Sequence, residues 1–161
     1  MPGHWEGDLV LGKRPSAVGT LVERHSRYVL LFPLPEGFTA ERMRPALTAA
    51  VLQLPQQLRR SLTWDQGREM ANHVQIAEAT GLDIYFCDPH SPWQRGSNEN
   101  TNGLLRQYLA KGADLRQFDQ AALDAIAAEL NNRPRERHGF RTPAEVLEQL
   151  LSQATTNHGV A

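Results

Sequence analysis

The sequence predicts an α/β fold, in which helices flank a mixed five-stranded sheet within a single domain. Two observations lead to this prediction. Residues 8–34 contain three short runs rich in valine and leucine with turn-forming residues between them, which is typical of antiparallel strands joined by tight turns. After Thr39, segments with helical spacing of apolar residues alternate with two more apolar runs, so two further strands are expected to join the sheet through helical crossovers.

The individual elements follow from the apolar periodicity and from start and stop signals. Strands are predicted at residues 8–12, 17–26, 28–34, 61–65 and 83–88. Helices are predicted at residues 39–54, 70–80, 98–111, 118–132 and 142–151. Thr39 is placed to cap the first helix, and Thr142 with Glu145 forms a capping-box pattern at the start of the last. The residues expected to face the core from the helices include Met43, Leu47, Val51, Met70, Val74, Ala77, Leu123, Ile126 and Leu130.

The composition fits one globular domain and excludes several classes of protein. Hydrophobic residues make up 40% of the 161 residues, which is enough for a core. The 17 Lys and Arg against 18 Asp and Glu give a net charge of -1, so the chain lacks the overall basic field of a free-standing nucleic-acid binder. The single Cys87 excludes an internal disulfide, and no apolar run reaches the ~20 residues of a membrane span. We expect a cytoplasmic protein without membrane contact, with a core at residues 1–151 and a disordered tail at 152–161.

Three acidic residues stand at the ends of predicted elements or within an apolar strand. Asp8 shares a strand face with Val10, so it is a charge among hydrocarbon side chains. Asp65 closes the fourth strand, which is expected to pair beside the first, and Gly67 follows to let the chain turn. Glu99 opens a helix after a glycine-containing loop. The order of strands therefore offers carboxylates from three separate segments to one end of the sheet.

These acids have an ordinary structural interpretation as well as a chemical one. A single Asp at a strand end is more often a turn former, and Glu99 alone is explained by the favourable helix dipole at an N-terminus. Three carboxylates brought together would raise one another's pKa unless a cation neutralised them. Mg²⁺ and Mn²⁺ prefer such oxygen ligands. The trio, and not any one member, favours a divalent metal site.

The segments around these acids resemble those of a known family of enzymes. The stretches "GHWEGDLV", "LTWDQGREM" and "PHSPWQRGSNENTNGLLRQYL" are similar to the three acid-bearing segments of DDE transposases and retroviral integrases, with 33 residues between Asp65 and Glu99. The stretch "LNNRPRERHGFRTPAEVL" is similar to a closing signature of bacterial transposases of the insertion-sequence thirty family. The four motifs occur in order and cover nearly all of residues 3–150, so the chain resembles the catalytic core of that family.

The resemblance implies an RNase H-like fold and a polynucleotidyl transferase that acts on DNA. It implies two Mg²⁺ or Mn²⁺ ions, with Asp8 bridging both, Asp65 holding one and Glu99 the other. The reaction would be DNA strand cleavage and strand transfer at insertion-sequence ends by in-line phosphoryl transfer, in a homo-oligomer that pairs two element ends. Such transposases usually carry an amino-terminal helix-turn-helix region, so a core that begins almost at Met1 is expected to be an isolated catalytic domain or a truncated product.

Several polar and basic residues are weaker candidates for DNA contact. They are Trp93, Gln94, Arg95, Asn98 and Asn102 around the third acid, and Arg133, Arg135 and Arg137, with Arg141, near the last helix. Each also has a plain interpretation, Trp93 as a loop anchor and the others as solvated surface residues. Glu6 shares the strand face of Asp8, but an exposed strand-end charge is the favoured interpretation. Two rival functions remain open, an RNase H-like nuclease without strand transfer and an inactive remnant that serves as an interaction domain.

Overall fold

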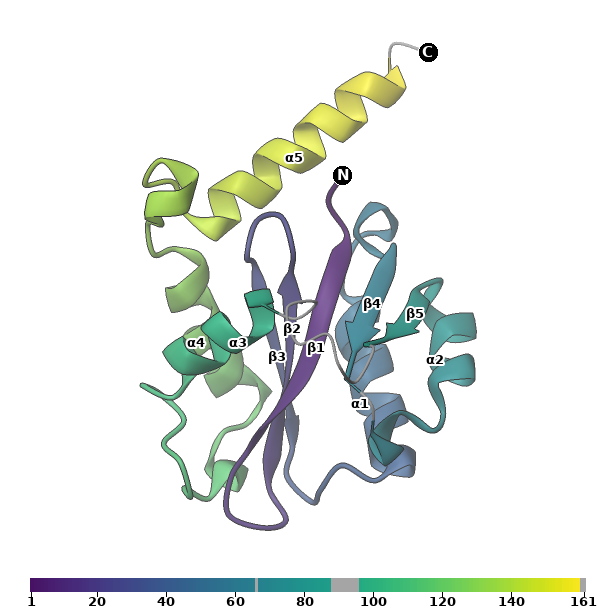
Figure 1. Cartoon of the computed structure of the whole chain (residues 1–161), viewed down its shortest axis with the longest axis vertical. Coiled ribbons are helices and arrows are strands. Elements are labelled where there is room, and N and C mark those ends of the chain that lie inside the picture. The colour runs from purple at the N-terminus through teal and green to yellow at the C-terminus, as the bar shows by residue number, and fades with distance from the viewer. Residues whose placement is uncertain (66, 88–95, 160–161) are drawn as a thin grey trace.

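The chain folds as one five-stranded mixed sheet with helices on both faces (Figure 1). The structure is a computed structural model that describes residues 1–65, 67–87 and 96–159, without the side chains of residues 96–100 and 154–159. The strands are β1 (His4–Leu11), β2 (Ala17–Glu23), β3 (Val29–Leu34), β4 (Ser61–Trp64) and β5 (Asp83–Phe86). Their order is β3-β2-β1-β4-β5, with β1, β2 and β3 antiparallel and with β4 parallel to both β1 and β5.

The helices divide between the two faces of the sheet. They are α1 (Ala40–Leu52), α2 (His73–Thr80), α3 (Gly96–Leu105), α4 (Gln120–Asn131) and α5 (Pro143–Gly159). In Figure 1, α1 and α2 lie on one face and α3 and α4 on the other, while α5 crosses one end of the sheet and extends away from it. Both crossovers that lead to parallel strands, through α1 and through α2, therefore cover the same face. This arrangement confirms the predicted fold class.

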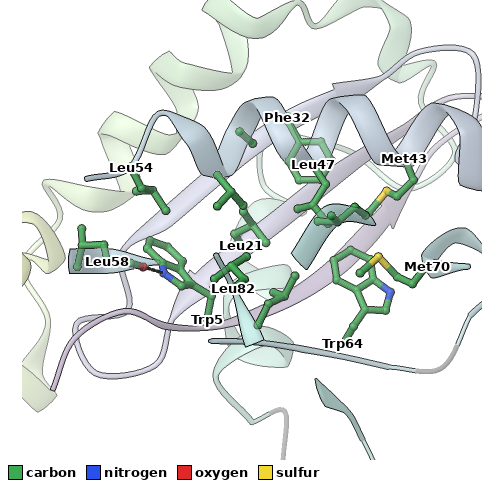
Figure 2. Packing of buried hydrophobic residues seen from close by; sticks show 14 of the residues in the cluster. Trp5, Leu21, Phe32, Met43, Leu47, Leu54, Leu58, Trp64, Met70 and Leu82 are labelled. Carbon is green, nitrogen blue, oxygen red and sulfur yellow. Dashed lines mark hydrogen bonds between the residues drawn. The ribbon is translucent and has the colours of Figure 1, made fainter. Parts of the chain in front are cut away.

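Each face of the sheet has its own hydrophobic core. The core under α1 includes Trp5, Phe32, Met43, Leu47 and Trp64, which Figure 2 shows packed between the helix and the strands. The indole Nε1 of Trp5 donates a hydrogen bond to the carbonyl oxygen of Leu58 at 2.8 Å, so this buried polar atom is satisfied. The core under α3 and α4 is lined by Val10, Val18, Leu105, Leu109, Leu123 and Leu130. Alternate residues of β1 thus supply both cores.

Several predicted element ends and core positions differ from the structure. The side chain of Thr39 makes no capping hydrogen bond at the start of α1. Val74 is 53% exposed rather than buried, because α2 begins only at His73 and the preceding turn at Arg68–Met70 is a separate 3-10 helix. Met70 and Val74 are therefore not on one continuous helix face, and Ile76 takes the inward position.

The last helix begins as predicted but ends later. Thr142 Oγ1 accepts from the N–H of Glu145 at 3.1 Å, and Glu145 Oε1 accepts from the N–H of Thr142 at 3.1 Å, so the predicted capping box is present. The bond from the Thr142 N–H to the Glu145 carboxylate lowers the pKa of Glu145, because it stabilises the ionised form. The helix continues to Gly159, which differs from the disordered tail expected at 152–161. Within the part of the chain that the structure describes, no helix has the length and apolar character needed to span a membrane.

Candidate active site

Asp8 and Asp65 lie side by side at the centre of the sheet. The parallel ladder between β1 and β4 pairs Gly7 with Trp64, so the next position on each strand is an aspartate. Neighbouring strands are about 4.8 Å apart, and residues opposite each other in a ladder point to the same face. That face is the one covered by α3, because Val10, two residues from Asp8, belongs to the core under α3 and α4. The predicted pairing of the fourth strand beside the first is confirmed.

The chain around Asp65 is fixed by a side-chain contact that the sequence does not reveal. The indole Nε1 of Trp64 donates to Glu69 Oε1 at 3.1 Å, which folds residues after Asp65 back onto the end of β4. A Cβ atom at Gly67 would overlap the carboxylate of Glu69, and the φ angle of Gly67 is -175°, which is extended backbone. The backbone of Gly67 therefore does not require glycine for a left-handed turn, and a larger residue there would displace the movable carboxylate of Glu69 from Trp64. Asp65 itself remains exposed at the strand end.

Asp8 is partly buried and is oriented by two hydrogen bonds. Its Oδ1 accepts from the N–H of Leu9 at 2.8 Å, and its Oδ2 accepts from Nδ2 of Asn102 at 3.0 Å. Asn102 lies in α3, so this bond joins the helix to the central strand. The amide oxygen of Asn102 is buried and has no hydrogen-bond donor among the described residues. Asn102, expected at the DNA or beside Glu99, therefore contacts the first acid.

Glu99 lies in the same helix, three residues before Asn102. Its backbone belongs to α3, and its side chain is outside the described part of the structure. Residues three apart on a helix are neighbours on its surface. The helix begins at Gly96, three residues before Glu99. Among the side chains that the structure describes, no group of three His, Cys, Asp or Glu residues forms a metal site.

The donor atoms at this end of the sheet suit a hard divalent cation. Asp8 and Asp65 offer carboxylate oxygens from adjacent strands, and the orphan amide oxygen of Asn102 is a further oxygen donor beside Asp8. Mg²⁺ and Mn²⁺ bind through oxygen ligands of these kinds. No histidine or cysteine is needed for such a site. The residues present therefore fit the cation type that the resemblance implies.

Glu6 is buried, which corrects the expectation of an exposed strand-end charge. Only 1% of the residue is exposed, and its Oε1 lies 3.4 Å from Nε of Arg24. It sits on the same face of β1 as Asp8, two residues earlier. A charge buried at this depth requires a partner, and Arg24 supplies one. Glu6 thus connects the row of acids on β1 to basic residues at the turn between β2 and β3.

The structure describes only some of the residues predicted to contact DNA. Trp93, Gln94 and Arg95 fall outside the described residues, and Asn98 is described only as a backbone position in α3. Arg133, Arg135 and Arg137 follow α4. Of these, Arg133 is already engaged, because its Nη2 donates to the hydroxyl of Tyr108 at 2.9 Å. The structure brings Arg135 and Arg137 near Arg27, a residue that the sequence does not single out because it reads as part of a polar turn.

The chain is similar to a known domain family and to known proteins. The integrase core domain model matches residues 1–92. The chain is 56% identical over 156 residues to the transposase for insertion sequence element IS1086 of Cupriavidus metallidurans, and 53% identical over 147 residues to the transposase InsI for insertion sequence element IS30C of Escherichia coli. These matches cover 96% and 91% of this chain but 46% and 38% of the two relatives, so the chain spans less than half of their length.

A solved structure shows the same fold. The catalytic core domain of BIV integrase matches with a TM-score of 0.69 and 24% identity, over 94% of this chain and 98% of the other. This likeness agrees with the RNase H-like sheet order described above. The family model includes Asp8 and Asp65, and the longer matches to the transposases extend over most of the chain. The chain therefore belongs to the integrase core domain family and corresponds to the integrase-type core of the IS30 group of insertion-sequence transposases.

Proposed function

We propose that this chain catalyses metal-dependent DNA strand cleavage and strand transfer at insertion-sequence ends, by in-line phosphoryl transfer in the cytoplasm. The observation that supports this most strongly is the adjacency of Asp8 and Asp65 on parallel strands with α3 docked onto Asp8 through Asn102. Glu99 is one helical turn before Asn102, so helix geometry favours a position near the same acids. The proposed catalytic and metal-binding residues are Asp8, Asp65 and Glu99.

Asp8, Asp65 and Glu99 would hold the two Mg²⁺ or Mn²⁺ ions of the proposed site. Bound ions of this kind activate the attacking oxygen and stabilise charge on the leaving oxygen at phosphorus. The chain's own contribution is to hold the ligands in position: the Leu9 N–H and the Asn102 amide fix the Asp8 carboxylate. Water would first attack a phosphodiester at the element end, leaving a free 3′-hydroxyl and a 5′-phosphate. That hydroxyl would then attack a phosphodiester of the target DNA, forming a new ester bond to its phosphorus and releasing the 3′-hydroxyl of the target strand. No protein nucleophile is required.

The DNA would contact residues around the third acid in the sequence and residues that follow α4. We propose Trp93, Gln94, Arg95, Asn98 and Asn102 for the first group, and Arg133, Arg135 and Arg137 for the second. Arginine side chains suit phosphate because their planar guanidinium groups donate two parallel hydrogen bonds. Strand transfer joins two element ends to one target, so the working form would be a homo-oligomer that holds both ends.

The decisive experiment supplies element-end DNA, a separate target duplex and Mg²⁺ or Mn²⁺ to the 161-residue chain, with the products resolved on a denaturing gel. We expect 3′-end cleavage followed by joined products. The variants Asp8→Asn, Asp65→Asn and Glu99→Gln should each lower both activities by a factor of at least about 10³, because each removes a charged ligand. Glu148→Gln, an exposed residue of α5, should keep full activity and serves as the control.

The products separate this function from its rivals. Metal-dependent cleavage without joined products would identify a nuclease of the same fold. No cleavage by the parent, with normal folding and metal binding, would support an inactive remnant. Activity that survives in Asp8→Asn would show that the proposed site is wrong, whichever product forms.

A further inference from the structure

The turn between β2 and β3 is held rigidly by a buried glutamate. Glu23 is fully buried, and its Oε1 accepts from the N–H of His25 at 3.1 Å, from the N–H of Ser26 at 2.8 Å and from the hydroxyl of Ser26 at 2.9 Å. The next residue, Arg27, has a φ angle of 67°. A residue other than glycine pays a conformational cost in this left-handed region. The turn therefore keeps Arg27 in one strained orientation.

The segment after α4 is fastened to the same end of the sheet. Asn131, which is 4% exposed, accepts from the N–H of Val29 at 2.8 Å and donates to its carbonyl oxygen at 3.0 Å. Further along, Nε2 of His138 hydrogen-bonds the carbonyl oxygen of Ser26 at 2.9 Å. Figure 1 shows this segment and the β2–β3 turn at the same end of the molecule, below α5. These bonds bring residues near 135 and 27 together although they are far apart in the chain.

Two arginines in these segments have buried donors that no described residue satisfies. Nε and Nη1 of Arg27 and Nε and Nη2 of Arg135 are buried and have no hydrogen-bond acceptor among the residues that the structure describes. Burial lowers the pKa of Arg27, and repulsion by Arg137, Arg24 and Arg135 lowers it further, against the attraction of Glu6. Burial and repulsion by Arg133 and Arg137 likewise lower the pKa of Arg135. Unpaired buried donors of like charge destabilise a folded protein unless an anion accepts their hydrogen bonds.

Three neighbouring arginines differ from Arg27 and Arg135 because their side chains donate to, or pair with, protein groups. Arg133 bonds Tyr108, and Arg24 pairs with Glu6. Arg141 donates from Nε to the carbonyl oxygen of His138 at 3.1 Å and from Nη1 to Gln149. Arg137 is exposed and lines a groove of about 410 Å³ between the β2–β3 turn and α5. Among the described arginines at this end of the sheet, Arg27, Arg135 and Arg137 are therefore the ones whose guanidinium groups can donate hydrogen bonds to an added anion.

We infer that Arg27, Arg135 and Arg137 form a binding site for a backbone phosphate of DNA, separate from the acidic residues. A phosphate group presents several acceptor oxygens and matches the paired donors of more than one guanidinium. Glu6, whose Oε1 lies 3.4 Å from Nε of Arg24 beside the same turn, stands two residues before Asp8, about 6.6 Å along β1. The turn that carries Arg27 and the strand that carries Asp8 are thus joined by an ion pair. The inference rests on the proposed DNA substrate and adds Arg27 to the residues that contact it.

The test measures DNA binding without catalysis. The 161-residue chain is titrated onto a fluorescent 20-base-pair duplex of arbitrary sequence in EDTA, by anisotropy at several NaCl concentrations. Each phosphate contact contributes about 0.9 to the slope of log K against log salt. We expect Arg27→Gln and Arg135→Gln each to weaken binding and to reduce the slope by about 1. Arg44→Gln removes an exposed charge from α1, on the opposite face of the sheet, and should keep the parent slope.

Several outcomes would overturn the inference. Parent slopes in both site variants would do so, as would an equal reduction in Arg44→Gln, which would indicate only general attraction. If Arg27→Gln fails to fold by circular dichroism, Arg135→Gln carries the comparison. If inorganic phosphate raises the melting temperature of the parent more than that of the variants while DNA slopes are unchanged, the site binds free phosphate and not DNA. The binding assay is done in EDTA, without metal, so a failure of catalysis in the strand-transfer assay would not change its result. Conversely, unchanged salt slopes would not bear on the proposed roles of the acids.

Discussion

At the scale of single residues, the candidate site depends on how Asp8 is held. One of its oxygens accepts from its own strand through Leu9, and the other accepts from α3 through Asn102. The second bond joins two residues that are 94 positions apart in the chain, so the position of α3 helps to determine the orientation of the carboxylate. Asn102 thus orients the carboxylate of Asp8.

Replacing Asn102 by an acid tests this role. Asn102→Asp keeps the shape but removes the donor and adds a negative charge beside Asp8. Without metal, the free energy of unfolding should fall by about 2 kcal/mol, the size of a lost hydrogen bond to a charged group. Mn²⁺ should restore more stability to this variant than to the parent, because it neutralises the added charge. Urea unfolding with and without Mn²⁺ measures both effects.

The control for this substitution lies in the same segment. Gln107→Glu adds the same charge at an exposed position five residues later, and its stability should not change with Mn²⁺ beyond the response of the parent. If Asn102→Asp behaves like Gln107→Glu, the contact between Asn102 and Asp8 does not influence metal binding.

His138 predicts a loss of stability on acidification. Burial lowers its pKa from the usual 6.5, and Arg137, Arg141 and Arg135 lower it further by repulsion, although the bond to Ser26 opposes the shift. Below pH 6.5 the unfolded chain takes up a proton that the folded chain resists, so stability falls as the pH decreases. His138→Gln should therefore lose less stability than the parent between pH 7.5 and 5.5 in urea titrations. Equal losses in the two proteins would show that His138 does not carry this effect.

At the scale of elements, the central strands require glycine where two large aromatic residues cross them. A Cβ atom at Gly7 would overlap the ring of Trp64, and one at Gly19 would overlap the ring of Phe32. Both rings belong to the core under α1. The absence of side chains at these two positions lets the rings approach β1 and β2 closely.

A pair of glycine substitutions separates packing from backbone effects. Gly7→Ala should lower the free energy of unfolding by about 1–3 kcal/mol, as is usual when a well-packed core is overfilled. Gly103→Ala, in α3, should raise it by about 0.5–1 kcal/mol, because a Cβ there meets no atom within 4 Å and alanine favours the helix. Urea unfolding measures both. A Gly7→Ala protein as stable as the parent would contradict the packing described for Trp64.

At the scale of the whole molecule, short-range patterns of the sequence predicted the sheet well. Alternation placed Val10 and Asp8 on one face and Leu9 on the other, because a strand has a strict period of two. The phase of α2 was predicted wrongly, because a 3-10 turn interrupts the run that begins at Met70. The alternation also did not predict that Glu6 is buried, because its burial depends on an ion pair with Arg24 in the turn between β2 and β3.

The candidate site was predictable where strand register determines it and not where distant segments converge. Asp8 and Asp65 become neighbours through a parallel ladder, which the order of strands and helices already favours. The docking of the segment after α4 against the turn that holds Arg27 depends on the hydrogen bond between His138 and Ser26, 112 residues apart. The arrangement depends also on the positive φ angle of Arg27, which no pattern of residue types predicts. Long-range docking of this kind can only be seen in three dimensions.

The shared metal site of Asp8, Asp65 and Glu99 is tested by thermal unfolding in EDTA and across a Mn²⁺ titration. A ligand at 100 times its Kd adds about 2.7 kcal/mol, which corresponds to a rise of roughly 5–10 °C for a domain of this size. We predict this saturable rise for the parent and for Glu148→Gln, and little or none for Asp8→Asn and Glu99→Gln. A rise in either acid variant equal to that of the parent would contradict a site built from these residues.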